Sequence, residues 1–140
     1  MIKVVLDTNV LISALIRTGK PRTLITEMVK HGTQLILSRG ILDEFAETVT
    51  DPKIRQYVGE EEAIRFLRVI SIIAKVAKVK SRFKVVKQDP SDDMILRTAY
   101  DGKADYIVSG DEHLLSLKEF RGIKILTIKE MLDLLKLWQK

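Results

Sequence analysis

The sequence predicts an α/β fold of three layers, in which helices cover both faces of a central parallel sheet of four to five strands. Short apolar runs rich in β-branched residues, such as residues 2–6 and 106–109, are typical of strands covered on both faces. Stretches with helical spacing of apolar residues separate these runs, and that alternation favours parallel strands joined by helical crossovers. The 140 residues contain no repeat or linker, so we expect one domain over residues 1–140.

Turn and capping residues set the expected elements of the first half of the chain. Gly19 separates two helices, and His31 at the end of the second is expected to favour the negative end of the helix dipole. Ser38 is placed to cap a third helix, and Gly59 is placed to open a longer one. The predicted elements are, in order, a strand over 2–6, a helix over 9–17, a helix ending at 31, a strand over 35–37, a helix over 39–51 and a helix over 60–77.

The second half of the chain continues the alternation. Asp89 and Pro90 introduce a helix whose apolar positions include Met94, Ile95 and Ala99. The other expected elements are strands over 83–86, 106–109 and 123–128 and a final helix over 130–138. Parallel strands end at one edge of a sheet, where ligands gather, so polar residues that follow these strands are the first candidates for a site.

The amino-acid composition limits the class of protein, the kind of metal ligand and the kind of partner that we expect. Apolar residues make up 46% of the chain and charged residues 31%, which excludes a disordered chain and a membrane-spanning one. The N-terminal segment has no signal-peptide pattern, so we expect a cytoplasmic protein. Because there is no cysteine, a bound metal must be held by oxygen or by the two histidines. The net charge of +5 favours an anionic partner such as nucleic acid.

Acidic side chains follow the predicted strands or begin the helices after them. Each has a structural alternative, because an acid at a helix N-terminus can cap the helix or favour its dipole. Together they are better explained by one cluster, since carboxylates held close together repel one another and require protons or a cation. Oxygen ligands of this kind suit magnesium, manganese or calcium. The candidate acids are Asp7, Glu44, Asp92, Asp93 and Asp111.

The segments around these acids resemble the four motifs of the PIN-domain family, and the resemblance covers nearly the whole chain. Val5–Ala14 is similar to the first motif, and Ser38–Phe45 is similar to the second. Asp92 stands seven residues ahead of Ala99, as in the third motif, and Ala104–Asp111 is similar to the fourth. All four motifs occur in order, so the resemblance is specific.

The resemblance implies a PIN-like fold with an acidic metal site. The expected cofactor is Mg²⁺ or Mn²⁺, as one ion or two, and Asn9 and Ser109 are the expected supporting residues. Asp93 stands where close relatives often carry asparagine, which leaves it as an alternative ligand beside Asp92. The implied catalytic and metal-binding acids are Asp7, Glu44, Asp92 and Asp111.

By the same resemblance, the expected activity is that of a metal-dependent ribonuclease acting on single-stranded RNA. Stand-alone members of the family are often toxins held by an antitoxin, and many dimerise, so we expect an antitoxin partner and a homodimer or higher oligomer. One alternative is a catalytically silent module that binds RNA or protein. Another is a phosphatase with Asp7 as nucleophile, although such enzymes usually carry a second Asp where this chain has Asn9.

A basic run without acids, from Lys75 to Lys87, supplies charge for the phosphates of RNA. Within it, Lys80, Arg82 and Lys84 are the expected RNA contacts, and a solvated surface is the alternative. His113, close to Asp111 in the chain, is a further candidate for a substrate contact, although the family tolerates many residues at its position.

Overall fold

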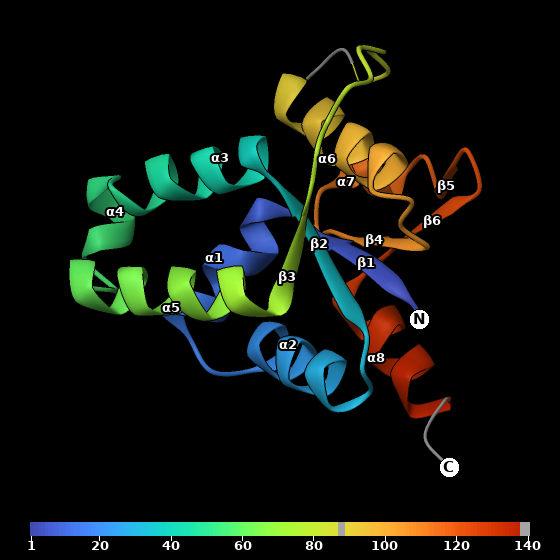
Figure 1. The fold of residues 1–140 in the computed structure, drawn as a ribbon. Coiled ribbons are helices and arrows are strands. Elements are labelled where there is room, and N and C mark those ends of the chain that lie inside the picture. Colours follow the sequence, from blue (N-terminus) through green and yellow to red (C-terminus); the bar gives the residue numbers. More distant parts are fainter. Residues whose placement is uncertain (87–88, 138–140) are drawn as a thin grey trace.

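A computed structural model describes residues 1–86 and 89–137, and a six-stranded sheet lies at its centre (Figure 1). The strands are β1 (Lys3–Leu6), β2 (Gln34–Ser38), β3 (Ala74–Ala77), β4 (Tyr106–Val108), β5 (Glu119–Phe120) and β6 (Ile123–Leu126). They lie in the order β3-β2-β1-β4-β6-β5, and all neighbours are parallel except β5, which pairs antiparallel with β6. The adjacent parallel strands β2, β1 and β4 therefore end at the same edge of the sheet.

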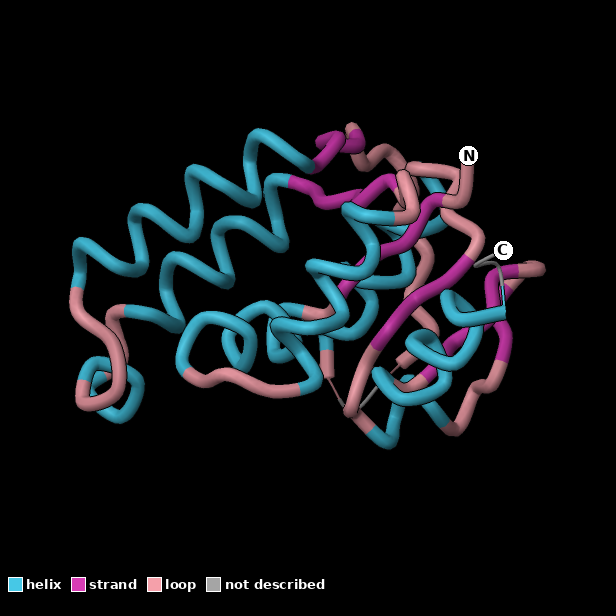
Figure 2. The backbone as a smooth tube through the Cα atoms, turned by 90° about the horizontal axis from the view of Figure 1, so that it is seen from below, coloured by secondary structure: helices cyan, strands magenta, loops and turns pink. Residues whose placement is uncertain are grey.

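Helices cover both faces of this sheet. They are α1 (Thr8–Ile16), α2 (Lys20–Lys30), α3 (Arg39–Val49), α4 (Pro52–Arg55), α5 (Glu60–Ile73), α6 (Pro90–Asp101), α7 (Glu112–Leu115) and α8 (Ile128–Leu137). In Figure 1, α2 and α8 lie together below the sheet and α6 lies above it. Figure 2 shows α3 and α5 side by side, extending away from the strands, and the rings of Phe45 and Phe66 stack between them with centroids 5.7 Å apart.

The predicted α/β class with a mostly parallel sheet and helices on both faces is confirmed, but the sheet has six strands instead of four to five. The predicted helix over 60–77 is wrong in its last turn, because it ends at Ile73 and Ala74–Ala77 form β3. Pairing with β2 outweighs the helical spacing there, and Gln34 Nε2 donates to the Ile73 carbonyl oxygen at 3.0 Å where the helix gives way to the strand. The strand predicted over 83–86 is also wrong, since no strand forms in that segment.

Residues 78–86, which we call the strap, run along α6 from its C-terminal end towards its N-terminal end. Where the strap begins, beside the C-terminal end of α6, the Asp101 Oδ2 atom accepts hydrogen bonds from the backbone N–H groups of Lys80 at 2.8 Å and Ser81 at 2.9 Å. Further along, the guanidinium of Arg97 donates to the Phe83 carbonyl oxygen at 2.7 and 2.9 Å. Side chains of α6 thus satisfy the backbone of the strap where a neighbouring strand would otherwise do so.

The buried apolar side chains form one cluster that includes Leu11 of α1 and Leu96 of α6, on opposite sides of the sheet. Within residues 1–86 and 89–137, no helix is long and apolar enough to cross a membrane. Two residues of the predicted patterns, Lys87 of the basic run and Trp138 of the last helix, lie outside the described residues.

Gly102, at the end of α6, allows this helix to approach the sheet closely. An added Cβ would stand 2.7 Å from Ile36 Cγ2 and 2.8 Å from the Thr98 carbonyl oxygen. We therefore predict that Gly102→Ala lowers the free energy of unfolding by about 1–3 kcal/mol through overpacking, measured by urea denaturation. Gly110→Ala is the matched control, because a Cβ there meets nothing within 4 Å; equal stabilities of the two variants would contradict the close approach.

Candidate metal centre

The carboxylate of Asp7 lies at the tip of β1 and is held by its neighbours. It is 6% exposed, and its Oδ2 atom accepts a hydrogen bond of 2.6 Å from the Ser109 hydroxyl at the end of β4. Its Oδ1 atom accepts from the backbone N–H of Asn9 at 3.3 Å, which caps α1. Ser109 in turn accepts a hydrogen bond of 2.9 Å from the backbone N–H of Asp111. One hydroxyl therefore ties two of the predicted acids together.

Asp92, Asp111 and His113 form a group with possible ligand atoms within 4.8 Å of one another. His113 Nδ1 lies 3.5 Å from Asp111 Oδ1, which also accepts from the His113 backbone N–H at 2.7 Å. Asp92, in the first turn of α6, is 3% exposed, and its Oδ2 atom has no hydrogen-bond partner among the described residues. A buried carboxylate oxygen without a partner is costly unless a proton or a cation occupies it.

Electrostatic interactions connect these acids with Glu44, which is partly buried on α3. Burial, followed by the charges of Asp7 and Asp89, raises the pKa of Glu44 above its ordinary value. Burial also raises the pKa of Asp7, against the hydrogen bonds from Ser109 and Asn9, and Asp111 and Asp89 raise it further. The structure thus brings Asp7, Glu44, Asp92 and Asp111 to one edge of the sheet, where the charge of Asp7 acts on Glu44 and Asp92 and the charge of Asp111 acts on Asp7 and Asp92.

Asp92 has the largest shift of the group. Burial, followed by the charges of Asp111, Asp89 and Asp7, raises its pKa to about 7, whereas His113 lowers it. Near neutral pH this carboxyl group is therefore poised between its protonated and ionised forms. Such a group is a strong candidate for a functional site, because its environment disfavours the charged form unless a cation is present.

Asp89 belongs to the same cluster, although sequence reasoning gave it no role beyond introducing the helix. It caps α6, with Oδ1 accepting from the Ser91 backbone N–H at 2.9 Å and from its hydroxyl at 2.7 Å. Its charge nevertheless raises the pKa of Asp7, Glu44 and Asp92. The signal that could have identified it is its position before α6, directly beside the third predicted acid.

Asp93 has a different environment from Asp92. Its Oδ1 atom accepts hydrogen bonds from the backbone N–H groups of Val85 at 2.8 Å and Val86 at 2.9 Å, which anchors the end of the strap. Asp93 is therefore engaged with the backbone, while its neighbour Asp92 has an unpaired oxygen beside Asp111. This contrast favours Asp92 over Asp93 as the acid that faces a metal.

The basic residues and His31 lie outside this cluster. Lys80 lines a hollow at the C-terminal end of α6, whereas Arg82 and Lys84 are exposed on the strap. His31 is the C-terminal cap of α2, with its Nε2 atom 3.6 Å from Glu27 Oε2. This position agrees with the structural interpretation of His31 at a helix end.

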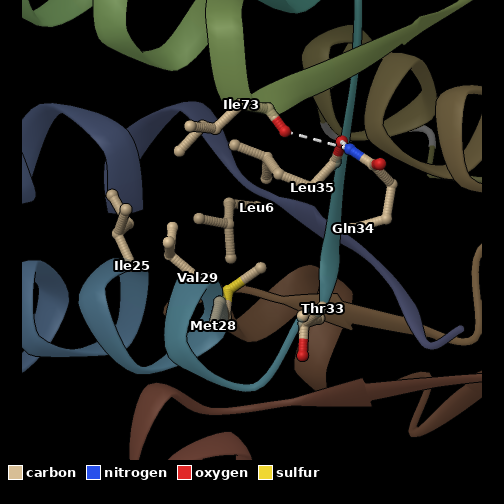
Figure 3. Close-up of a pocket in the computed structure, with 9 residues that line it drawn as sticks. Leu6, Ile25, Met28, Val29, Thr33, Gln34, Leu35 and Ile73 are labelled. Atoms are coloured by element: carbon tan, nitrogen blue, oxygen red, sulfur yellow. Dashed lines mark hydrogen bonds between the residues drawn. The ribbon is translucent and has the colours of Figure 1, made fainter.

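A separate hollow of about 270 Å³ lies among α2, β2 and the end of α5 (Figure 3). Figure 3 shows Leu6, Ile25, Met28 and Val29 around it, and the Gln34 side chain bonded to the Ile73 carbonyl at its rim. Its lining contains no carboxylate, so it does not offer the donors that a magnesium or manganese ion needs. The acidic cluster remains the candidate metal centre.

Comparisons with known proteins identify similar sequences and folds. A family model described as "PIN domain" matches residues 3–113. The uncharacterized protein MJ1680 of Methanocaldococcus jannaschii is 35% identical over 120 residues, which cover 84% of this chain and 76% of that protein. The fold is similar to a chain in the crystal structure of VapBC2 from Rickettsia felis bound to a DNA fragment from their promoter. That match has a TM-score of 0.64 and 12% identity and covers 90% of this chain and 98% of the other.

The raised pKa of Asp92 predicts how the stability of the metal-free protein depends on pH. Between about pH 4 and pH 7, the folded protein keeps a proton on Asp92 that the unfolded chain has lost, so its stability falls as the pH rises. Asp92→Asn should therefore raise the free energy of unfolding near pH 8 by roughly 2–4 kcal/mol and change it little near pH 4. The measurement is urea denaturation in EDTA at both pH values.

Asp93→Ala is the matched comparison, because it removes the neighbouring acid and leaves two backbone N–H groups without their partner. It should lower the free energy of unfolding by about 1–3 kcal/mol at both pH values. If Asp92→Asn destabilised the protein near pH 8 as Asp93→Ala does, the interpretation of Asp92 as an unpaired acid would be wrong.

Proposed function

The chain belongs to the PIN domain family, and from this premise we propose that it is a metal-dependent ribonuclease that hydrolyses phosphodiester bonds of single-stranded RNA. The observation that carries the proposal is the nearly buried Asp92, whose unpaired oxygen lies beside Asp111 and His113. Asp7 adds a carboxylate whose ionisation is coupled to Asp111, and Glu44 adds one whose ionisation is coupled to Asp7. An acidic cluster of this kind is suited to a cation that in turn binds phosphate.

The residues of the cluster fit a divalent cation. Carboxylate oxygens are the ligands that Mg²⁺ and Mn²⁺ prefer, and the mutual repulsion of the acids is relieved when positive charge lies between them. When bound, such a cation lowers the pKa of a water molecule and stabilises negative charge on phosphate oxygens. We assign the binding of Mg²⁺ or Mn²⁺ to Asp7, Glu44, Asp92 and Asp111, with Asp89 and His113 beside them.

The other residues of the site hold these acids in position. The Ser109 hydroxyl, which is fully buried, donates to Asp7 and accepts from the backbone of Asp111, so it fixes the distance between two strand ends. Asn9 acts through its backbone N–H, which orients the second oxygen of Asp7. The His113 side chain is 52% exposed and lies beside the Asp111 carboxylate.

Two features of the site bear on the alternative functions. Both oxygens of Asp7 accept hydrogen bonds and its side chain is buried, which is unfavourable for a nucleophile that must attack phosphorus. This argues against the phosphatase. A silent binding module would have no need to keep several carboxylates in mutual repulsion, so the intact cluster favours an enzyme, and a cleavage assay separates these two functions.

We also propose that the chain acts with a protein partner. Its fold resembles that of a chain from VapBC2, and by this likeness we place it as the toxin of a toxin–antitoxin pair. An antitoxin would then bind the folded chain, which we expect to form a homodimer or a higher oligomer.

Cleavage of single-stranded RNA should require a divalent cation and Asp7. We expect the wild type to produce fragments with 5′-phosphate and 3′-hydroxyl ends in Mg²⁺ or Mn²⁺ and none in EDTA. Asp7→Asn should reduce the rate by at least about a hundredfold and leave the circular dichroism spectrum unchanged, because the cluster loses a ligand and not a packing contact. Asp133→Asn, which removes an exposed acid on α8, is the control. Activity of Asp7→Asn within a few-fold of the wild type would contradict the assignment of Asp7 to the metal site.

Binding of the cation should also stabilise the fold independently of activity. A ligand that binds only the folded chain contributes about 2.7 kcal/mol at a hundredfold excess over its Kd, so Mn²⁺ should raise the Tm of the wild type by several degrees. Asp111→Asn should lose most of this increase, and Asp133→Asn should keep it. An equal increase in both variants would place the bound cation elsewhere.

A further inference from the structure

Two neighbouring hollows meet over β3, the edge strand of the sheet. One, of about 460 Å³, lies between the end of α6 and β3, and the other, of about 340 Å³, lies between β3 and the start of α3. Val76, Ala77 and Lys78 belong to the walls of both hollows. We call these two adjoining hollows together the β3 groove.

The lining of the β3 groove is strongly basic. Its only acid among the described lining residues is Asp101, and that carboxylate is engaged, because its Oδ2 atom accepts hydrogen bonds from the strap at Lys80 and Ser81. The cations that line the groove are Lys3, Lys75, Lys78, Lys80, Lys103 and Arg39. An excess of positive charge in a concave surface attracts a polyanion.

One of the two hollows lies beside α3 and α6, the helices that carry Glu44 and Asp92. This hollow reaches Gly40 of α3 and Met94 of α6, and these two helices touch there, since a Cβ on Gly40 would stand 2.6 Å from Met94 Sδ. Asp92 precedes Met94 by two residues, and Glu44 lies about one helical turn beyond Gly40. An extended anion that binds over β3 therefore reaches the helices that carry two of the acids that we assign to the metal.

Chain geometry distinguishes the groove from the outer face of the strap. Along the strap, Lys80, Arg82 and Lys84 are exposed at alternate positions, as expected for an extended segment, but only Lys80 lines the groove. Arg82 and Lys84 are exposed and line neither hollow. The concave surface with several cations offers more simultaneous phosphate contacts than a row of two side chains in open solvent.

We propose that the β3 groove binds the sugar–phosphate backbone of single-stranded RNA next to the bond that is cut, a role that rests on the proposed ribonuclease function. Lysines and arginine contact successive phosphates, and the exposed Val76 side chain, between Lys75 and Lys78 in the chain, contacts the less polar sugars and bases. The groove thus holds the strand while the acids act on one of its bonds.

The test compares two double variants that remove the same charge. Lys75→Gln/Lys78→Gln removes two cations of the groove, and Arg82→Gln/Lys84→Gln removes two from the outer face of the strap. Binding of a fluorescent single-stranded RNA is measured by anisotropy at several KCl concentrations in EDTA, where no cleavage occurs. The groove variant should lower the slope of log affinity against log salt by about 1.4, because each phosphate contact on a single strand contributes about 0.7, and the strap variant should leave it unchanged.

The same variants separate this proposal from the ribonuclease function. In Mn²⁺ the groove variant should raise KM at unchanged kcat, because it loses binding and not chemistry. An RNA-cleaving wild type with equal salt slopes in both variants would overturn the groove and leave the function standing. RNA binding that depends on the groove, without cleavage, would support the groove and contradict the proposed ribonuclease function. A groove-dependent slope for duplex DNA but not for single-stranded RNA would overturn the choice of RNA.

Discussion

The structure depends on the crowding of carboxylates at one edge of the sheet. β1 and β4 are adjacent and parallel, so the acids that follow them, Asp7 and Asp111, are forced into proximity, and Ser109 fixes that proximity with two hydrogen bonds. α6 brings Asp92 against them with an unpaired oxygen. Each ionised acid makes ionisation of the next acid less favourable. Burial, together with these neighbouring charges, raises the pKa of Asp92 to about 7. The folded chain therefore holds mutually repelling carboxylates together at the place where a bound cation would relieve their repulsion.

Two adjacent residues show how the fold assigns different tasks to the same chemical group. Asp93 accepts two backbone hydrogen bonds and holds the end of the strap, as Asp101 holds its beginning two helical turns later. Asp92, one residue earlier, points to the cluster and accepts no bond at Oδ2 from the described residues. Because successive helix positions differ by about 100°, neighbouring acids of α6 face different surroundings. Asp93 stabilises the segment that flanks the site, and Asp92 contributes charge to it.

These contacts explain how much of the fold and of the candidate site could be predicted from the sequence. The alternation of apolar runs and helical stretches was sufficient for the fold class, and the strand ends indicated Asp7 and Asp111, which the structure connects through the Ser109 hydroxyl. Asp89 was missed because its capping role accounts for an acid at that position without reference to the distant Asp7 and Glu44. The preference for Asp92 over Asp93 rested on the family resemblance alone, since the contacts that distinguish the two residues depend on the path of the strap, part of which was predicted to be a strand.

The error over residues 74–77 had the largest consequence for function. In the predicted helix over 60–77, Lys75 would lie on an exposed face and Lys78 would directly follow the helix, so both would belong to an ordinary solvated surface. As β3 and the residue after it, they instead lie on the edge of the sheet beside the end of α6, where the sheet and helix together form a concave wall. Cations thus lie over β3, and the acidic cluster includes residues of α3 and α6, the helices that border the same hollow. On the proposed function, a cation in the acidic cluster removes the repulsion between that cluster and RNA, and RNA in turn adds negative charge next to the cation. Binding of the two should therefore be mutually favourable, because a coupling free energy between two sites acts equally in both directions.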